Sequence, residues 1–182
     1  HREIDAGTAT RLAGMVAEAH AHAPRRETRG AEIMTGLGAQ LSKAFIDSPD
    51  IFAPAETLEF HALYEASLLA NRALMNARGE EGRVRRCHGD MHAGNVIVEE
   101  VVPKLFDAIE FSEKIATIDV LYDLAFLLMD LFERGLGAAG NVAFNRYLVE
   151  TRRTADLDAL KALPFYLSMR AAIRAKVTAA RP

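Results

Sequence analysis

The chain has 182 residues, of which 50% are hydrophobic and 26% are charged, a composition typical of a globular protein with one medium-sized core. Its formal net charge of −3 excludes the global basic field that attracts nucleic acid or anionic lipid, so we expect neither nucleic acid nor membrane as a partner. The single cysteine, Cys87, excludes an internal disulfide and is typical of a reducing compartment such as the cytoplasm. The longest apolar stretch, residues 120–132, contains Asp123 and Asp130 and is shorter than the roughly 20 residues of a membrane helix. It predicts a buried helix.

Helical periodicity dominates the first 80 residues. Apolar side chains recur at helical spacing over residues 2–23, and the segment "APRRETRG" then interrupts the pattern. A second helical stretch is predicted over residues 27–45. A third, over residues 48–82, opens after two prolines and closes at Gly79 and Gly82, as helices commonly do.

Residues 83–107 change character. The short runs "NVIVEE" and "VPKLFD" are rich in β-formers and flank a polar turn, so they predict a small hairpin or two short strands. Helical periodicity returns at about 118–134, 138–153 and 163–178. We therefore expect one domain over residues 1–182, mostly α within an α+β class, with a single β-hairpin beside a polar cluster.

The polar cluster "RCHGDMHAGN" precedes the hairpin and allows three interpretations. On an extended strand His88, Asp90 and His92 would alternate to one face, where they could bind zinc and support hydrolysis. Gly89 and Gly94 favour an irregular loop instead. In such a loop, the polar side chains could simply cap backbone groups.

The third interpretation rests on the spacing of two acids and an amide. Asp90 is followed five residues later by Asn95, and a strand pair then leads to Asp107. Phosphoryl transfer needs one carboxylate to accept the proton of the attacking hydroxyl and oxygen ligands to hold Mg²⁺ against the nucleotide phosphates. In protein kinases an Asp, an Asn and a later Asp have these roles.

The segment "HGDMHAGN" resembles the H-G-D-x-x-x-x-N signature of the aminoglycoside phosphotransferase family, kinase-like enzymes that phosphorylate small molecules. The similarity covers about residues 83–132 and 163–178, where the chain resembles a bacterial branch whose phosphotransferase domain is often joined to a P-loop ATPase domain. This resemblance implies the helical C-terminal lobe of a protein-kinase-like fold. It also implies ATP and Mg²⁺ as cofactors and a small hydroxylated molecule as acceptor.

The resemblance also assigns roles to individual residues. Asp90 matches the catalytic base, and Asn95 and Asp107 match the metal ligands. His88 matches a residue that supports the catalytic loop, and Asp123, in "YDLA", matches an acid that braces this loop through its backbone N–H groups.

Other polar residues near the cluster have less certain roles from sequence. His92 and Glu110 are candidates for contact with substrate or for support of the site, and Glu110 also fits an exposed strand end. Asp119 is either the N-cap of the helix after "ATI" or an acid on the face of Asp123. The run Arg83, Arg85 and Arg86 is expected to form a solvated edge, with contact to a phosphate or carboxylate as the alternative.

A kinase-like enzyme also needs a nucleotide-binding lobe with strands and a strand lysine. Lys43 is the only lysine among the first 100 residues and lies in a helical pattern, and no G-x-x-x-x-G-K-[ST] motif occurs. The chain begins with His1, which suggests a cut within a longer protein. We therefore expect the nucleotide lobe to be absent from this chain, and the chain alone to be nearly inactive. A kinase-like module that senses nucleotide or regulates a partner ATPase without catalysis is the competing hypothesis.

Overall fold

The computed structural model describes residues 4–99 and 102–180. Three helices come first and confirm the helical periodicity of the N-terminal half: α1 (Ala6–His22), α2 (Gly30–Ile46) and α3 (Pro54–Glu80). The helix α1 begins at Asp5, whose carboxylate accepts a hydrogen bond from the Thr8 backbone N–H at 2.7 Å. Pro54 occupies the first turn of α3, where the missing N–H costs nothing.

The second half carries the short strands and the remaining helices. They are β1 (Val84–Arg86), the 3₁₀ turn η1 (Ala93–Asn95), β2 (Val96–Glu99), β3 (Val102–Leu105), α4 (Glu113–Ala116), β4 (Thr117–Asp119), α5 (Val120–Glu133), α6 (Gly137–Thr151), α7 (Thr154–Asp158), η2 (Ala159–Ala162) and α8 (Leu163–Ala179). The strands β2 and β3 form the predicted antiparallel hairpin, and β1 pairs with β4 in a second two-stranded sheet that was not predicted. The fold class is confirmed: mostly helical with small antiparallel sheets.

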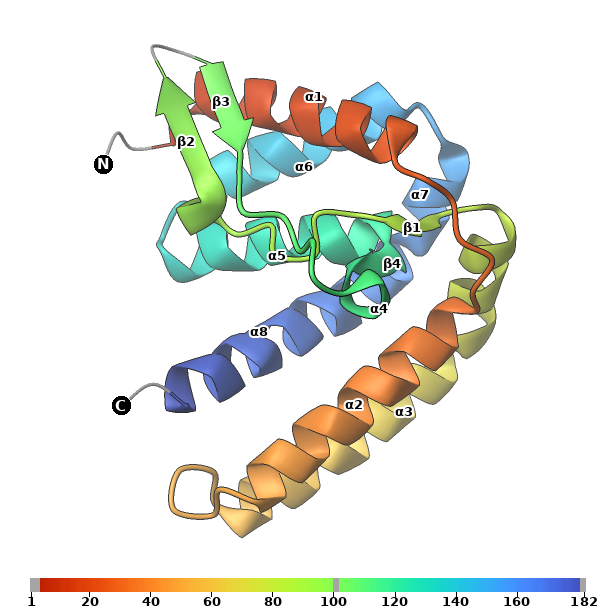
Figure 1. The fold of residues 1–182 in the computed structure, drawn as a ribbon, viewed down its shortest axis with the longest axis vertical. Coiled ribbons are helices and arrows are strands. Elements are labelled where there is room, and N and C mark those ends of the chain that lie inside the picture. Colours follow the sequence, from red (N-terminus) through yellow and green to blue (C-terminus); the bar gives the residue numbers. More distant parts are fainter. Residues whose placement is uncertain (1–3, 100–101, 181–182) are drawn as a thin grey trace.

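The helices pack in pairs (Figure 1). Helix α1 lies along α6, α2 lies antiparallel to α3, and α5 packs against both α6 and α8. The hairpin β2–β3 lies beside the start of α1. The pair α2 and α3 forms the lower part of the molecule in this view, next to α8. The predicted buried helix is confirmed in α5, where every residue from Val120 to Leu131 is buried.

The helix α5 begins two residues later than predicted, because residues 117–119 pair with β1 instead. Asp119 is confirmed as its N-cap: a carboxylate oxygen accepts a hydrogen bond from the Leu121 N–H at 2.8 Å. No helix within residues 4–99 and 102–180 is long and apolar enough to cross a membrane.

The expectation of a solvated arginine edge is wrong for Arg83 and Arg85, which are 5% and 4% exposed. Arg83 Nη2 lies 2.7 Å from both carboxylate oxygens of Asp156. The same Asp156 accepts from Arg78 Nη1 at 3.1 Å, and Arg78 also forms a bidentate pair with Asp119, with both distances 2.7 Å. These buried arginines are therefore neutralised by carboxylates that lie far away in the sequence.

Arg85 has a different reason to be buried. Its Nη1 donates to the carbonyl oxygens of His20 and Ala21, both at 2.8 Å, so it caps the C-terminal end of α1. A cation at this end also interacts favourably with the helix dipole. Of the three arginines only Arg86 reaches the surface, where its Nε pairs with Glu113 at 3.1 Å.

Candidate active site

The cluster predicted from sequence forms a loop over residues 87–95, between β1 and β2. Two consecutive peptide N–H groups of this loop donate to one buried carboxylate: His88 N to Asp123 Oδ2 at 3.2 Å and Gly89 N to Asp123 Oδ1 at 3.0 Å. Asp123 is completely buried in α5. The backbone of the loop is thus held by a fixed negative charge in the core of the protein.

Asp123 remains ionised although it is buried. Burial alone would raise the pKa of its carboxyl, but a hydrogen bond from His20 Nε2 at 3.2 Å and the nearby Arg170 hold the pKa below its ordinary value. The hydroxyl of Tyr147 lies 2.9 Å from His20 Nδ1. The ring of His20 is thus held between the hydroxyl of Tyr147 and the carboxylate of Asp123.

Gly89 gives the loop its shape. Its φ is +82°, a left-handed conformation, and a Cβ at this position would lie 3.0 Å from Ile109 Cδ1. The carbonyl of Gly89 accepts from Arg170 Nη1 at 3.1 Å, and Arg170 Nε also donates to Tyr122 O at 3.1 Å. Sequence reasoning missed Arg170, since 81 residues separate it from Gly89.

Asp90 and Asn95 lie side by side, because η1 folds the chain back between them. The Nδ2 group of Asn95 donates to the Asp90 backbone carbonyl at 3.0 Å and to Asp90 Oδ2 at 3.3 Å. Asn95 is buried, whereas the Asp90 side chain is 40% exposed. The carboxylate of Asp90 is therefore both oriented by its neighbour and open to a molecule in solution.

The hairpin returns the chain so that Asp107 follows next to Asn95. The Phe106 N–H donates to Asn95 O at 3.2 Å, and His88 Nε2 lies 2.9 Å from Phe106 O. Asp107 is exposed, with a left-handed φ of 59°. His88 thus connects the loop 87–95 to the residue before Asp107.

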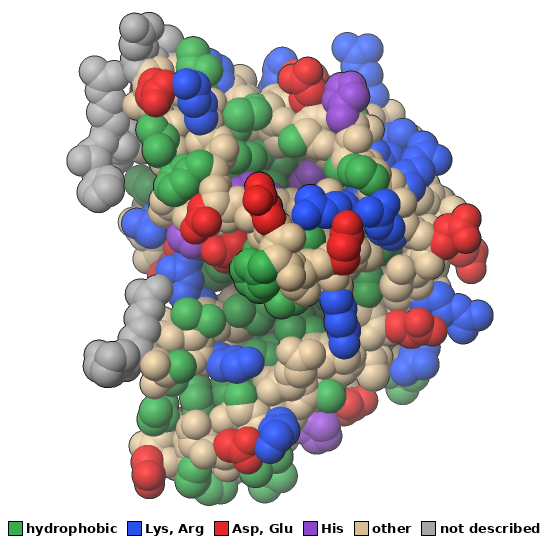
Figure 2. Space-filling model, in the orientation of Figure 1, with side chains coloured by type: hydrophobic (Ala, Val, Ile, Leu, Met, Phe, Trp, Pro, Cys, Tyr) green, Lys and Arg blue, Asp and Glu red, His purple; other side chains and the backbone are tan. Residues whose placement is uncertain are grey.

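The donor set at this end of the hairpin fits Mg²⁺. Within the described ranges, neither Asn95 Oδ1 nor the Asp107 carboxylate accepts a hydrogen bond, so both offer free oxygens. Carboxylate and amide oxygens are the ligands that a hard cation prefers. Acidic side chains gather near the middle of the face in Figure 2, over the region of the loop and α4 in Figure 1.

The two less certain candidates differ in placement. His92 Nδ1 accepts from the Gly94 N–H at 3.1 Å, and its Nε2 lies 3.6 Å from Asp90 Oδ2, so the ring lies beside the candidate base. Glu110 is exposed and forms no ion pair with any residue that the structure describes. A further support, Asp130, was missed: its Oδ2 accepts from the loop N–H of Ala93 at 2.8 Å.

The alternation that would direct His88, Asp90 and His92 to one face is not observed, because these residues form an irregular loop. Both ring nitrogens of His88 have backbone partners: Nδ1 lies 3.3 Å from Asp90 N, and Nε2 lies 2.9 Å from the carbonyl of Phe106. The zinc interpretation therefore has no geometric support.

A different trio of metal-ligating side chains converges, with ligand atoms within 4.8 Å of one another: His20, Cys87 and Asp123. All three residues are buried. Burial raises the pKa of the Cys87 thiol well above its ordinary value, and the ring of His20 already has two partners. These contacts explain the trio as part of the buried support of the loop.

The sequence profile of the phosphotransferase enzyme family (APH) matches residues 2–163. The chain therefore belongs to this family, and the match includes the N-terminal helices, for which the sequence resemblance was slight. Uncharacterized proteins of Mycobacterium tuberculosis (Rv2004c) and Mycobacterium bovis (Mb2027c) are each 32% identical over 108 residues. The alignment covers 59% of this chain but only 21% of each relative, and no solved structure matches the chain significantly.

Proposed function

We propose that this chain is the C-terminal, acceptor-binding lobe of a kinase-like enzyme that transfers a phosphoryl group from ATP to a hydroxyl group of a small molecule. Membership of the phosphotransferase family supports the reaction type. The observation that carries the proposal is the pair Asp90 and Asn95. They are held 3.3 Å apart in a loop whose backbone is fixed by buried Asp123, and the carboxylate of Asp90 stays open to solvent.

In the proposed reaction, the Asp90 carboxylate accepts the proton of the acceptor hydroxyl as this oxygen attacks the phosphoryl group. The amide of Asn95 restrains Asp90, so little reorientation is needed when the acceptor binds. His92, 3.6 Å from Asp90, lies where it can contact the acceptor. Asp123, His88 and Arg170 hold the loop without touching the reactants.

We further propose that Asn95 Oδ1 and the Asp107 carboxylate are the protein ligands of Mg²⁺. When bound with ATP, Mg²⁺ neutralises charge on the phosphate oxygens. The left-handed turn at Asp107 and the contact between Phe106 N and Asn95 O place these two residues next to each other in the fold.

A separate nucleotide-binding lobe is proposed to complete the site. In the described part of the chain, no strand precedes Val84, and Lys43 lies in α2, where its exposed side chain pairs with Asp47 at 2.8 Å. Neither feature offers the strand lysine that holds nucleotide phosphates in kinases. The aligned stretch is only a fifth of the mycobacterial relatives, so a nucleotide lobe and a P-loop ATPase domain could both lie elsewhere in such proteins.

The proposal is tested by substituting Asp90 with Asn in the longest version of the protein that contains these residues. The assay follows Mg·ATP consumption with a panel of hydroxylated small molecules. Asp90→Asn is expected to lower kcat by about 10²–10⁴-fold, the usual contribution of a general base, with nucleotide affinity unchanged. The control Asp50→Asn removes an exposed carboxylate in the α2–α3 connection and should leave kcat unchanged.

Two outcomes would contradict the assignment. Full turnover by Asp90→Asn would remove Asp90 as the base. Tight nucleotide binding by the wild type, without turnover on any acceptor, would instead favour a nucleotide-sensing module. The 182-residue chain alone is expected to show little or no turnover.

A further inference from the structure

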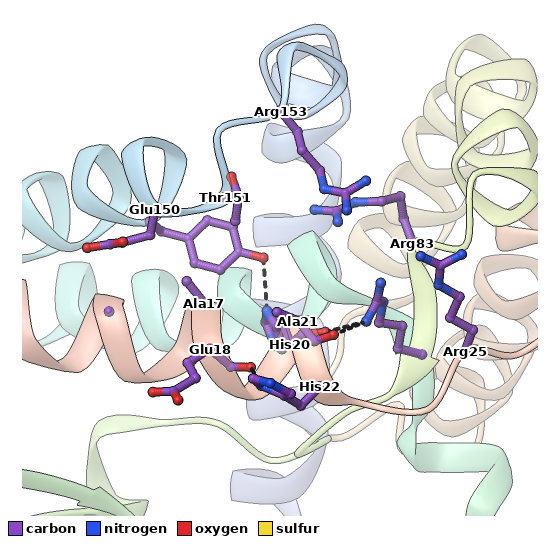
Figure 3. Close-up of a pocket in the computed structure, with 13 residues that line it drawn as sticks. Ala17, Glu18, His20, Ala21, His22, Arg25, Arg83, Glu150, Thr151 and Arg153 are labelled. Atoms are coloured by element: carbon purple, nitrogen blue, oxygen red, sulfur yellow. Dashed lines mark hydrogen bonds between the residues drawn. The ribbon is translucent and has the colours of Figure 1, made fainter.

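Away from the loop 87–95, a polar hollow lies between the end of α1, the strand β1 and the end of α6 (Figure 3). Its volume is about 560 Å³, within the range of small-molecule sites, and no residue of the loop 87–95 lines it. Four of its lining residues are arginines: Arg25, Arg83, Arg85 and Arg153. These arginines come from three segments that lie far apart in the sequence, so the hollow is a product of the fold and not of one basic segment.

Backbone contacts bring these arginines together. The chain after α1 runs antiparallel to β1, with a bridge between Arg25 and Arg85 and a hydrogen bond from Arg26 N to Val84 O at 3.0 Å. On the other side, Arg152 ends α6 in a left-handed conformation with φ 50°. The chain turns there, and the side chain of Arg153 points back toward Arg83 in Figure 3.

Of the four arginines that line the hollow, Arg83 alone pairs with a carboxylate among the residues described. Arg83 is 5% exposed and pairs with Asp156 through Nη2, but its Nε is buried without a partner in the described part of the chain. A buried N–H of this kind costs free energy unless something accepts from it. No ion pair of Arg25 or Arg153 occurs among the residues that the structure describes.

The acids at the hollow do not offset this charge. Glu18 and Glu150 also line it, but both side chains point away from the arginines in Figure 3, and Glu150 pairs with Arg146. Burial first, and then the charges of Arg25, Arg83 and Arg153, lower the pKa of Arg85. Like charges that crowd in this way are stabilised by a bound anion.

We propose that this hollow binds a phosphate group, either inorganic phosphate or the phosphate of a small monoester, through Arg25, Arg83 and Arg153. Guanidinium groups form bidentate, charge-assisted hydrogen bonds with phosphate oxygens, and Arg25 and Arg153 are exposed and form no ion pair with the residues described. Arg85 has a structural role as the wall of the site, because its Nε and Nη1 are occupied by backbone carbonyls. This site is separate from the proposed active site and does not depend on kinase activity.

The test is isothermal titration calorimetry on the chain without Mg²⁺, with inorganic phosphate, glycerol phosphate and citrate as separate probes. The test variant is Arg25→Gln/Arg153→Gln, in which both substituted side chains are exposed, so the fold should persist. The control is Arg152→Gln, which removes one positive charge next to Arg153 at a residue that does not line the hollow. Circular dichroism checks that each variant folds.

We expect saturable binding at one site. The double substitution should weaken it by at least about tenfold, and the control should change it by less than about twofold, since hydrogen bonds to charged groups are the strong ones. Tighter binding of glycerol phosphate would identify a monoester site, and equal affinities would identify a phosphate site. The proposal is overturned by the absence of saturable phosphate binding in the millimolar range, by an unchanged affinity in the double variant, or by a preference for citrate.

Discussion

The substitution Asp123→Asn tests the support of the loop 87–95 most directly. The carboxylate accepts from His88 N, Gly89 N and His20 Nε2, and it is completely buried. The asparagine side chain has the same shape but only one acceptor oxygen, so its NH₂ group must face one of these donors. The substitution also removes the negative charge that lies 3.7 Å from Arg170 Nη2. Removing one partner of a buried charged network costs about 3–5 kcal/mol. This is a large share of the roughly 5–15 kcal/mol by which domains are stable.

The assay is urea unfolding followed by circular dichroism, together with hydrogen exchange at the His88 and Gly89 amides. With a urea dependence of about 1–3 kcal/mol per molar, the loss corresponds to a midpoint lower by about 1 M or more. The control Asp47→Asn breaks only the exposed pair with Lys43 and should cost less than about 1 kcal/mol. If Asp123→Asn lost no more stability than this control, and the two amides stayed protected, Asp123 would not be the support described above.

The remaining predictions concern the loop and the buried groups around it. Gly89→Ala should destabilise the fold by about 1–3 kcal/mol because of its left-handed backbone. Gly14→Ala, in α1 where an added Cβ meets no neighbouring atom, should instead stabilise by about 0.5–1 kcal/mol; thermal unfolding of the two variants checks the difference. Asp123 and Asp130 both have a pKa below the ordinary value of 3.8, because hydrogen bonds and nearby cations outweigh burial. Each carboxylate stabilises the fold fully when the pH is above its pKa in the unfolded chain, and this stabilisation is lost as the pH falls through the lower pKa in the folded chain. The urea midpoint of the wild type should therefore drop between about pH 5 and pH 2. It should drop less steeply in Asp130→Asn, which lacks one of the two carboxylates. The Cys87 thiol, whose pKa burial raises, should react with iodoacetamide only at the rate of unfolding, and rapid labelling of the folded chain would contradict its burial.

The main features of the fold could be predicted because they depend on local periodicity. The helices over the first 80 residues, the helix at 120–133 and the hairpin after the loop all follow from patterns within a short window. The strands β1 and β4 are three residues each, too short to show alternation, and their partners lie more than thirty residues apart. Their pairing depends on tertiary structure that no local pattern contains.

In the candidate site, too, the features set by nearby residues could be predicted and those set by tertiary contacts could not. The spacing of Asp90, Asn95 and Asp107 was visible in the sequence, because a short loop and a tight hairpin keep these residues near one another. The contacts of Arg170 and the pairing of Arg83 with Asp156 were not visible, since 81 and 73 residues separate the partners. A run of charged residues usually lies in solvent, which is why Arg83 and Arg85 are expected from sequence to be exposed. The fold instead buries Arg83 against the carboxylate of Asp156 and Arg85 against backbone carbonyls at the end of α1.

The left-handed backbone at Asp107 has a consequence for any effort to make this protein more heat-resistant. A residue with a side chain pays up to about 1 kcal/mol of folding free energy to adopt a φ of 59°, and glycine does not. A redesign for stability alone would therefore replace Asp107 with glycine early. Such a replacement would remove one of the two side chains proposed above to hold Mg²⁺. Under the proposed function, a library selected only for heat resistance would gain stability at position 107 and lose a proposed ligand of Mg²⁺ there.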